Sequence, residues 1–262
     1  MATVGTFCLY KNEAVFIRPH ILSWVPHVDE MVIYDGNSTD GTVEIVKDIQ
    51  KNHPFGSRIK LFENKDPKDL TDDYVRVFDE CLHALSTNFA AFTHGDMILE
   101  DPGNIGFLGD AIAYYSTMRS FAGEPGGQLY EIKSGRSPFW KNIYRLRSPD
   151  LGLHYHGHYG HVSEDCYFSK ITGAEHIHVG DAFEQYPYEV KDSGVKIAHY
   201  SDVRAHERRA ERMFKCLINQ GKPAAEALRL LDVHPRVTLK DGFNFKFEPV
   251  DTPDFLKQGA TA

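Results

Sequence analysis

The stretch IYDGNSTDGTVEIV, residues 33–46, decides the fold. It begins inside the apolar, β-branched run 30–34, a pattern typical of a buried strand. It ends in a helical pattern that starts at Thr42. Between the two stand Gly36 and Gly41, which can adopt backbone angles closed to other residues, among side chains that cap helices and build tight turns. The stretch therefore predicts a strand-to-helix turn.

Asp35 stands at the carboxyl end of the predicted strand. In open α/β sheets, ligands bind at the carboxyl ends of strands. A carboxylate at that position can accept hydrogen bonds from a base or a ribose. A well-capped turn without a ligand is the simpler alternative. We favour the binding interpretation because a turn alone rarely needs an aspartate at the very end of the strand.

The composition limits the class of protein. With 262 residues, 42% of them apolar, the chain can bury a sizeable core in one large domain, with or without an appendage. Its formal charge of −8 argues against a broad nucleic-acid-binding surface. The N-terminus has no basic leader and no apolar run approaches the length of a membrane span, so we expect a cytoplasmic protein. The four cysteines show no CxxC pairing, which indicates buried free thiols.

Strands alternate with helices over the first hundred residues. The patterns predict strands at 3–9, 30–34, 58–62 and 88–93, and helices at 13–24, 42–51 and 72–85. Such alternation implies parallel pairing with right-handed crossovers, as in a nucleotide-binding α/β half. After Pro102 we expect short antiparallel strands, and from Ser201 to about Asp232 we expect helix with a turn at 221–223.

A second polar turn follows the predicted strand 88–93. It reads His94-Gly95-Asp96, so Asp96 also comes at the carboxyl end of a strand. An imidazole and a carboxylate flanking a glycine can ligate one divalent ion. The carboxylate favours magnesium or manganese, and the imidazole shifts the preference towards the transition metal. A plain turn would explain the three residues as well, so the metal interpretation needs support from elsewhere.

The segment 151–170 is rich in histidine. It contains His154, His156, His158 and His161. A zinc cluster is one interpretation, and we favour the other, in which these side chains donate hydrogen bonds to a phosphate or a substrate. Ser163 is a good N-cap for a helix with Glu164 and Asp165 in its first turn. Acids there compensate the helix dipole, but a carboxylate at the edge of a polar site can also act as a general base.

The order of these pieces resembles the family 2 glycosyltransferases. There a first strand is followed by KNE, as at residues 11–13, and then by DDGSTDGT or DSGSTDGT, where this chain reads DGNSTDGT at 35–42. A metal motif of DxD type follows where HGD stands, and an ED motif follows where 164–165 stand. Residues 196–215 resemble the segment after the catalytic domain in bacterial lipopolysaccharide-core members. The resemblance covers residues 3–100 well and 150–215 loosely.

The resemblance implies a GT-A fold, in which a mixed, mostly parallel central sheet of Rossmann type is flanked by helices, with further helices at the C-terminus. The catalytic domain would span 1–200, with a nucleotide-binding half at 1–100 and an acceptor half at 101–200. A helical extension and tail at 201–262 would pack on it. The implied enzyme moves a sugar from a nucleoside diphosphate sugar, which we expect to be a UDP-sugar, to an acceptor hydroxyl with inversion.

The resemblance also implies roles for particular residues. Asp35 would contact the base or ribose. The donor site would further be lined by Lys11, Glu13, Arg76, His94 and Gly95. Asp96 would bind a divalent metal, with His94 and His199 as further ligands. Asp165 matches the acid that removes the acceptor proton, and Glu164 stands beside it.

One departure from the family pattern concerns the metal. The first acid of the DxD pattern is His94 here. A neutral imidazole adds no charge against the metal, so magnesium should be held less well, whereas manganese tolerates nitrogen better. We therefore expect Mn²⁺ to be preferred over Mg²⁺.

Two other classes fit part of the pattern. A nucleotidyltransferase or pyrophosphorylase generally carries a glycine-rich basic loop after the first strand, where this chain reads CLYKNEAVF. A non-catalytic module that binds sugar nucleotides or glycans would tolerate the replacement at His94.

The acceptor stays open among lipid-linked sugar, capsular glycan, protein and modified nucleic acid. The predicted basic helix within 204–215 is interpreted as a solvated face or, alternatively, as a peripheral contact with anionic lipid headgroups or a phosphorylated acceptor.

Overall fold

The structure is a computed structural model of the chain. It describes residues 3–64, 77, 80–81, 83–108, 113–134, 141–146, 153–154, 168–170, 176–177, 190–219, 221–241 and 245–258. The chain divides into two compact units. The first comprises Met1–Thr117 and Lys141–Ile197, and the second comprises Met118–Trp140 and Ala198–Ala262. Each unit is thus discontinuous in sequence, and the continuous domains that we expect at 1–200 and 201–262 stay a prediction.

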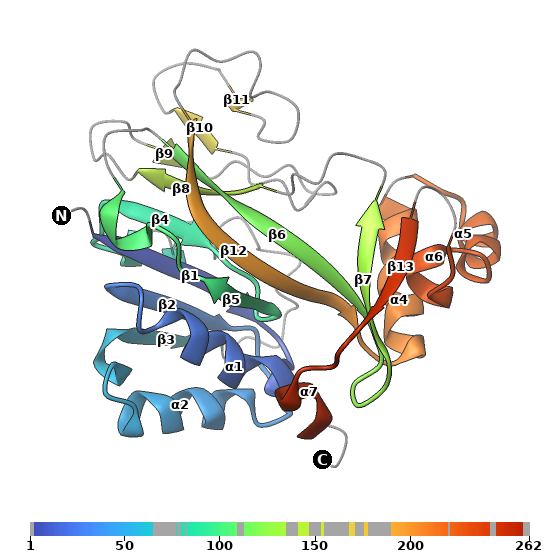
Figure 1. Ribbon diagram of the computed structural model, residues 1–262, viewed down its shortest axis with the longest axis horizontal. Coiled ribbons are helices and arrows are strands. Elements are labelled where there is room, and N and C mark those ends of the chain that lie inside the picture. The colour runs from blue at the N-terminus through green and yellow to red at the C-terminus, as the bar shows by residue number, and fades with distance from the viewer. Residues whose placement is uncertain are drawn as a thin grey trace. The chain divides into compact units, whose positions relative to one another are not determined.

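Four parallel strands form the centre of the first unit. They are β1 (Val4–Tyr10), β2 (Glu30–Asp35), β3 (Ile59–Glu63) and β4 (Phe89–Phe92), in the order β3-β2-β1-β4 (Figure 1). All four agree with the predicted strands to within one residue at both ends. The β-branched and aromatic residues of the two central strands β1 and β2 are buried, as expected for parallel strands covered on both faces, whereas Phe62 on β3 is exposed.

The strand order reverses between β1 and β4. The chain proceeds outward from β1 through β2 to β3 and then returns to place β4 on the other side of β1. In open α/β sheets, ligands bind outside the carboxyl ends of the strands at such a reversal. The turns that follow β1 and β4 are therefore the first place to look for a site.

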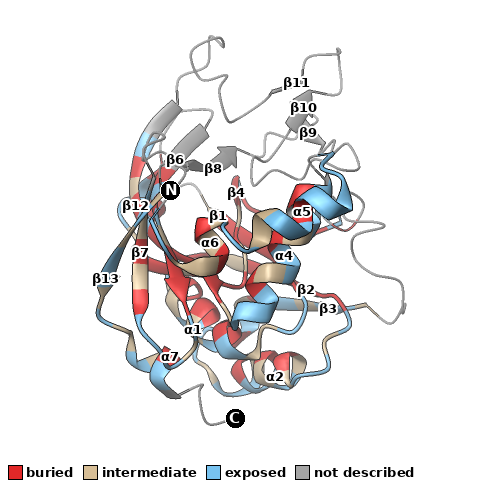
Figure 2. Cartoon of the chain, turned by 90° about the vertical axis from the view of Figure 1, so that its right-hand side faces the viewer, coloured by how far each residue is buried: buried red, intermediate tan, exposed pale blue. Residues whose placement is uncertain are grey.

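Helices α1 (Ala14–Trp24) and α2 (Thr42–Asn52) pack against each other (Figure 1). α1 also packs against β5 (Met97–Asp101). It buries residues at helical spacing: Phe16, Ile17, His20, Ile21 and Trp24. α2 buries Thr42, Val46 and Ile49 and exposes charged residues on its outer side (Figure 2). Both helices begin within a residue of the predicted positions.

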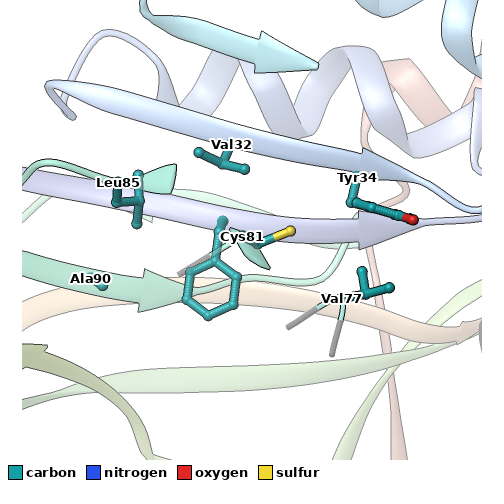
Figure 3. Packing of buried hydrophobic residues seen from close by; sticks show 7 residues of the cluster. Val32, Tyr34, Val77, Cys81, Leu85 and Ala90 are labelled. Carbon is teal, nitrogen blue, oxygen red and sulfur yellow. The ribbon is translucent and has the colours of Figure 1, made fainter. Parts of the chain in front are cut away.

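An apolar cluster covers one face of the parallel strands. Figure 3 shows its members, which are Phe7, Val32, Tyr34, Val77, Cys81, Leu85 and Ala90. Val77 and Cys81 are helical residues within the predicted helix 72–85, most of which lies outside the described residues. Because side chains alternate along a strand, Tyr10 and Asp35 point to the opposite face from Phe7 and Tyr34. Cys8 and Cys81 are buried free thiols, as expected.

Antiparallel strands extend the first unit, as predicted for the region after Pro102. β8 (Lys141–Leu146) pairs with β4 and with the first half of β6 (Ala113–Gly123). β12 (Val190–Val203) pairs with β5. A separate small sheet consists of β9 (Leu153–His154), β10 (Phe168–Lys170) and β11 (His176–Ile177). Short 3₁₀ turns occur at η1 (Gly56–Arg58) and η3 (Ile105–Phe107).

The second unit combines strands with helices. The last residues of β6 pair with β7 (Leu129–Ser134), which pairs with β13 (Phe245–Val250). Its helices are α4 (His206–Asn219), α5 (Ala224–Leu231), α6 (Pro235–Thr238) and α7 (Asp254–Gln258). The predicted turn at 221–223 is confirmed, with Gly221 at φ 82°.

The predicted helix start at Ser201 is wrong. β12 continues to Val203, and every residue from Ile197 to Val203 is buried. A run buried on both sides is the environment of a central strand, and its aromatic and β-branched residues suit that state. The helix begins at His206 instead.

The basic residues at the start of α4 are mostly engaged within the unit. Arg209 is 4% exposed and donates to the Gly123 carbonyl at 2.7 Å. Arg204 and Arg212 both donate to the Ser201 carbonyl. The interpretation of 204–215 as a uniformly solvated or lipid-facing surface is therefore wrong for Arg209. No helix in the described part of the chain is long and apolar enough to cross a membrane.

Candidate functional site

The β2–α2 turn presents a buried carboxylate. Asp35 ends β2 and is 3% exposed, and its Oδ2 accepts the backbone N–H of Ser38 at 2.9 Å. Its Oδ1 is also buried, and among the described residues no donor reaches it. Asn37 (φ 65°) and Gly41 (φ 92°) take left-handed backbone angles, which asparagine tolerates and which glycine adopts freely because it has no Cβ.

Asp40 fastens the same turn to two helices. One carboxylate oxygen accepts the backbone N–H of Thr42 at 3.1 Å, and the other accepts that of Ala14 at 3.0 Å. Burial by itself raises the pKa of Asp40, but hydrogen bonds from Thr42 and Ala14 outweigh it and hold the pKa below its ordinary value. The carboxylate therefore satisfies backbone donors at the first turns of both α1 and α2.

The β1–α1 turn is hydrogen-bonded to the β2–α2 turn. Asn12, at φ 57°, donates its N–H to Ser38 Oγ at 2.8 Å, and its side-chain oxygen accepts the Thr39 N–H at 2.8 Å. The Glu13 N–H donates to Thr42 Oγ1 at 3.0 Å. The residues predicted to line the nucleotide-sugar site, Lys11, Glu13 and Asp35, thus belong to two turns that are hydrogen-bonded to each other.

The β4–β5 turn meets the β1–α1 turn. It is closed by a hydrogen bond from the Met97 N–H to the His94 carbonyl at 3.0 Å. A Cβ at Gly95 would lie 2.3 Å from a ring carbon of Tyr10 and 3.4 Å from Glu13 Cγ, so only glycine allows this approach. Asp96, the last residue before β5, is 4% exposed. The structure therefore brings His94, Gly95 and Asp96 against the KNE turn.

Two side chains of α1, neither of which we predicted, hold this turn. The Met97 carbonyl accepts a hydrogen bond from His20 Nδ1 at 2.7 Å and one from Trp24 Nε1 at 3.0 Å. Both side chains are fully buried. The one available signal in the sequence is a histidine on the apolar face of the helix, at helical spacing from Ile17 and Trp24.

Burial keeps three groups around the turn uncharged near neutral pH. It raises the pKa of the Cys8 thiol to about 12 and, together with the nearby Cys8, raises that of Tyr10 well above its ordinary value. Burial also lowers the pKa of His20 to about 4, against the opposing effects of the Met97 carbonyl and Asp96. These three groups therefore add no charge to the site.

A metal would find few protein ligands in the described residues. Nowhere among them do three His, Cys, Asp or Glu side chains converge into a metal-binding group. Asp96 and His94 lie on the same short turn and supply a carboxylate and an imidazole. Magnesium-like ions are commonly held by one or two carboxylates together with substrate phosphates, so this small donor set suits a metal that arrives with a diphosphate. His199 is buried on β12 in the second unit, and its role as a ligand stays a prediction.

Several predicted residues lie outside the described residues. They are Arg76, His156, His158, His161, Ser163, Glu164 and Asp165. His154 falls in β9. The predicted roles of these residues therefore stay predictions.

Comparison with known proteins places the fold. No family model matches the chain, and no curated protein matches its sequence significantly. Among solved structures, the mannosyltransferase PcManGT from Pyrobaculum calidifontis, in complex with GDP-Man and Mn²⁺, is 15% identical, with a TM-score of 0.51. The match covers 98% of this chain and 67% of that one. The chain has a GT-A fold.

Two further matches are weaker. Glucosyl-3-phosphoglycerate synthase from Mycobacterium tuberculosis, in complex with Mn²⁺, UDP and phosphoglyceric acid, is 17% identical over 85% of this chain and 80% of that one, with a TM-score of 0.44. TarS from S. aureus is 15% identical over 45% of this chain and 22% of that one, with a TM-score of 0.38. With TM-scores below 0.5, neither match adds to the assignment of the fold. The expected GT-A fold, with its mostly parallel sheet flanked by helices, is confirmed.

Proposed function

We propose that this protein is a glycosyltransferase that moves a sugar from a nucleoside diphosphate sugar to an acceptor hydroxyl. The observation that carries the proposal is Asp35, whose buried Oδ1 accepts no hydrogen bond from the described residues. A buried carboxylate oxygen without a donor is costly, and a ligand hydroxyl or base N–H would satisfy it. Asp35 stands next to the point where the strand order of this GT-A fold reverses, and in open α/β sheets ligands bind at such a point.

The donor we favour is a UDP-sugar, as the sequence motifs imply. Asp35 would accept from the base or ribose, and Lys11 and Glu13 on the connected turn would line the same pocket. Arg76 would add a further contact. The structurally similar mannosyltransferase binds GDP-Man, so GDP is the competitor to test beside UDP.

A divalent cation bound with the donor would offset the negative charge that grows on the leaving diphosphate. Asp96 and His94 would hold it, and the imidazole favours Mn²⁺ over Mg²⁺. Gly95 contributes by its missing side chain, because its close approach to Tyr10 keeps the Asp96 turn beside the KNE turn.

The remaining step is proton removal from the acceptor. In this proposal Asp165 takes the proton as the hydroxyl attacks the anomeric carbon from the face opposite the diphosphate, which inverts that carbon. Asp165→Asn should reduce transfer by about 10²- to 10⁴-fold with donor affinity kept, whereas Glu164→Gln should not. If both variants transfer normally, the base lies elsewhere.

The decisive experiment is a thermal-shift and calorimetry series with UDP, GDP and UDP-sugars, with and without Mn²⁺. Wild-type protein should be stabilised by a nucleoside diphosphate, and Asp35→Ala should lose that shift while its melting temperature without ligand changes little. Asp29→Ala is the matched control. Asp29 accepts the Val4 N–H at 2.9 Å at the amino end of β1, opposite the candidate site, so its loss should lower stability but not the ligand shift.

Turnover assays separate the competing classes. Slow release of nucleoside diphosphate from the sugar nucleotide supports the transferase. Formation of a nucleoside triphosphate that requires pyrophosphate would support a pyrophosphorylase instead. Binding without either reaction would support a non-catalytic module. If Asp35→Ala lowers stability but leaves the ligand shift unchanged, the β2–α2 turn is a capped turn and not a binding site.

A further inference from the structure

The β4–β5 turn is anchored at both ends by one buried side chain. His20 Nδ1 lies 2.7 Å from the Met97 carbonyl, and His20 Nε2 lies 3.4 Å from Thr93 Oγ1. A carbonyl can only accept, so the hydrogen must be on Nδ1, which leaves the Nε2 lone pair to accept from the Thr93 hydroxyl. The imidazole thus bridges the first and last residues of the turn that carries Asp96.

Other rings restrict the same turn. Trp24, one helical turn beyond His20 on α1, donates to the same Met97 carbonyl at 3.0 Å. Tyr10 lies edge-on to His20, with ring centroids 5.7 Å apart, and blocks the space beside Gly95. Tyr10, His20 and Trp24 are each at most 1% exposed. Besides its own hydrogen bond from Met97 to His94, the turn therefore rests on a buried support of aromatic side chains.

The chemistry proposed for this turn demands such a support. A carboxylate that places a metal-bound diphosphate must stand within a fraction of an ångström of its working position. Groups that orient metal ligands from behind commonly change metal affinity or activity by about 10- to 100-fold when removed. A histidine that served only to fill the core could be replaced by leucine with loss of stability and nothing else.

We propose that His20 is a positioning residue, which sets the location of Asp96 through the Met97 carbonyl and the Thr93 hydroxyl. This inference rests on the proposed function. It concerns a side chain that does not touch the donor and that acts through the backbone of the turn. Its effect should therefore appear in metal affinity and kcat, and not in the affinity for the nucleotide at Asp35.

The test compares three variants of the full chain. His20→Leu removes both hydrogen bonds. His20→Asn keeps an N–H group near the position of Nδ1, so it can still donate to Met97. Ile21→Ala is the matched control, because Ile21 is equally buried on α1 but carries no polar group. Mn²⁺ binding with saturating UDP is measured by electron paramagnetic resonance, UDP affinity without metal by calorimetry, and kcat by UDP release.

We expect His20→Leu to weaken Mn²⁺ binding and lower kcat by about 10- to 100-fold, with the affinity for UDP in the absence of metal nearly unchanged. His20→Asn should recover both to within about threefold of wild type. Ile21→Ala should lower the melting temperature without this pattern. The proposal is overturned if His20→Leu keeps wild-type Mn²⁺ binding and kcat, or if Ile21→Ala reproduces its defects.

If His20→Leu fails to fold, His20→Gln takes its place, because its amide reaches the position of Nε2 rather than that of Nδ1. His20→Asn must then bind Mn²⁺ more tightly than His20→Gln, and equal or reversed affinities overturn the proposal. A wild-type protein that neither binds Mn²⁺ with UDP nor releases UDP overturns the proposed function itself, and the role of His20 falls with it.

Discussion

The two turns that meet in the candidate site are stabilised in opposite ways. The β2–α2 turn, Asp35–Thr42, is held by its own side chains, since Asp35 bonds to Ser38 and Asp40 bonds to Thr42. The β4–β5 turn, Thr93–Met97, depends on His20 and Trp24, which lie 77 and 73 residues away from Met97 in sequence. The first turn is bonded through its own side chains and to the β1–α1 turn, whereas the second takes its support from buried side chains of α1.

The difference matters for how each turn tolerates change. When one side chain of a locally bonded turn is removed, the protein loses about the stabilisation free energy of one capping interaction. A turn seated on buried rings shifts as a whole when its support changes, because close-packed interiors transmit small displacements. We therefore expect substitutions at the second turn to affect catalysis more strongly, and the following predictions test that expectation.

The largest effect is expected at Asp96. Asp96→Asn should reduce Mn²⁺-dependent release of UDP from a UDP-sugar by about 10²-fold or more, because the neutral amide is a poor ligand for a hard cation. Binding of UDP without metal should persist, since the Asp35 turn is intact. Initial rates with Mn²⁺, Mg²⁺ and a chelator provide the measurement.

His94→Asp is the complementary variant. It adds an anionic oxygen and should improve the use of Mg²⁺ relative to Mn²⁺. If a chelator leaves turnover unchanged, the metal has no part in the mechanism. The β4–β5 turn would then not be a metal-binding turn.

The next effect is expected in stability. Gly95→Ala forces a Cβ to within 2.3 Å of the Tyr10 ring, so it should cost about 1–3 kcal/mol of unfolding free energy. Gly41→Ala, in the first turn, meets no atom within 4 Å and should cost only the backbone penalty of its φ of 92°, about 1 kcal/mol. Urea denaturation measures both.

A double-mutant cycle separates the two causes. In a Tyr10→Leu background the cost of Gly95→Ala should fall, because the ring that it meets is gone, whereas the cost of Gly41→Ala should not change. Equal costs of Gly95→Ala in both backgrounds would show that the second turn does not depend on Tyr10.

The smallest effect is expected at Asp40. Asp40→Ala should lose about 1 kcal/mol near neutral pH, as for the removal of a helix-capping side chain. The folded-state pKa of Asp40 is lowered, so its contribution is present above the unfolded-state pKa and is lost as the pH falls through the folded-state pKa. The difference in stability between wild type and variant should therefore shrink below about pH 4. A difference that stays constant to pH 3 would mean that the carboxylate charge does not contribute.

The same contrast explains what could be predicted from the sequence. The β2–α2 turn was predictable because its glycines, its capping residues and the strand before it are neighbours in the chain. The parallel strands of the first hundred residues were predictable from short apolar runs for the same reason. The location of His94, Gly95 and Asp96 at the end of a strand was predictable too, but nothing adjacent to them in sequence shows what holds the turn.

Long-range effects account for what was missed. His20 and Trp24 look like ordinary members of an apolar helix, and their partner at Met97 becomes evident only when α1 packs on β5. Residues Ser201–Val203 mix polar and apolar side chains, and burial within β12 overrides that polarity. From the sequence alone Arg209 suits a solvated helix surface. In the structure it is buried and donates to the carbonyls of Gly123 and Val237.

The discontinuous make-up of the two units has a consequence for how such a gene can diversify. The chain enters the second unit at Met118, leaves it at Lys141 and enters it again at Ala198. A single crossover near residue 197 would join a new Ala198–Ala262 to an inherited Met118–Trp140. β13 would then have to pair with a β7 from the other parent. Replacement of the second unit as an intact cassette requires two coordinated exchanges, which favours change by substitution in place over wholesale domain shuffling.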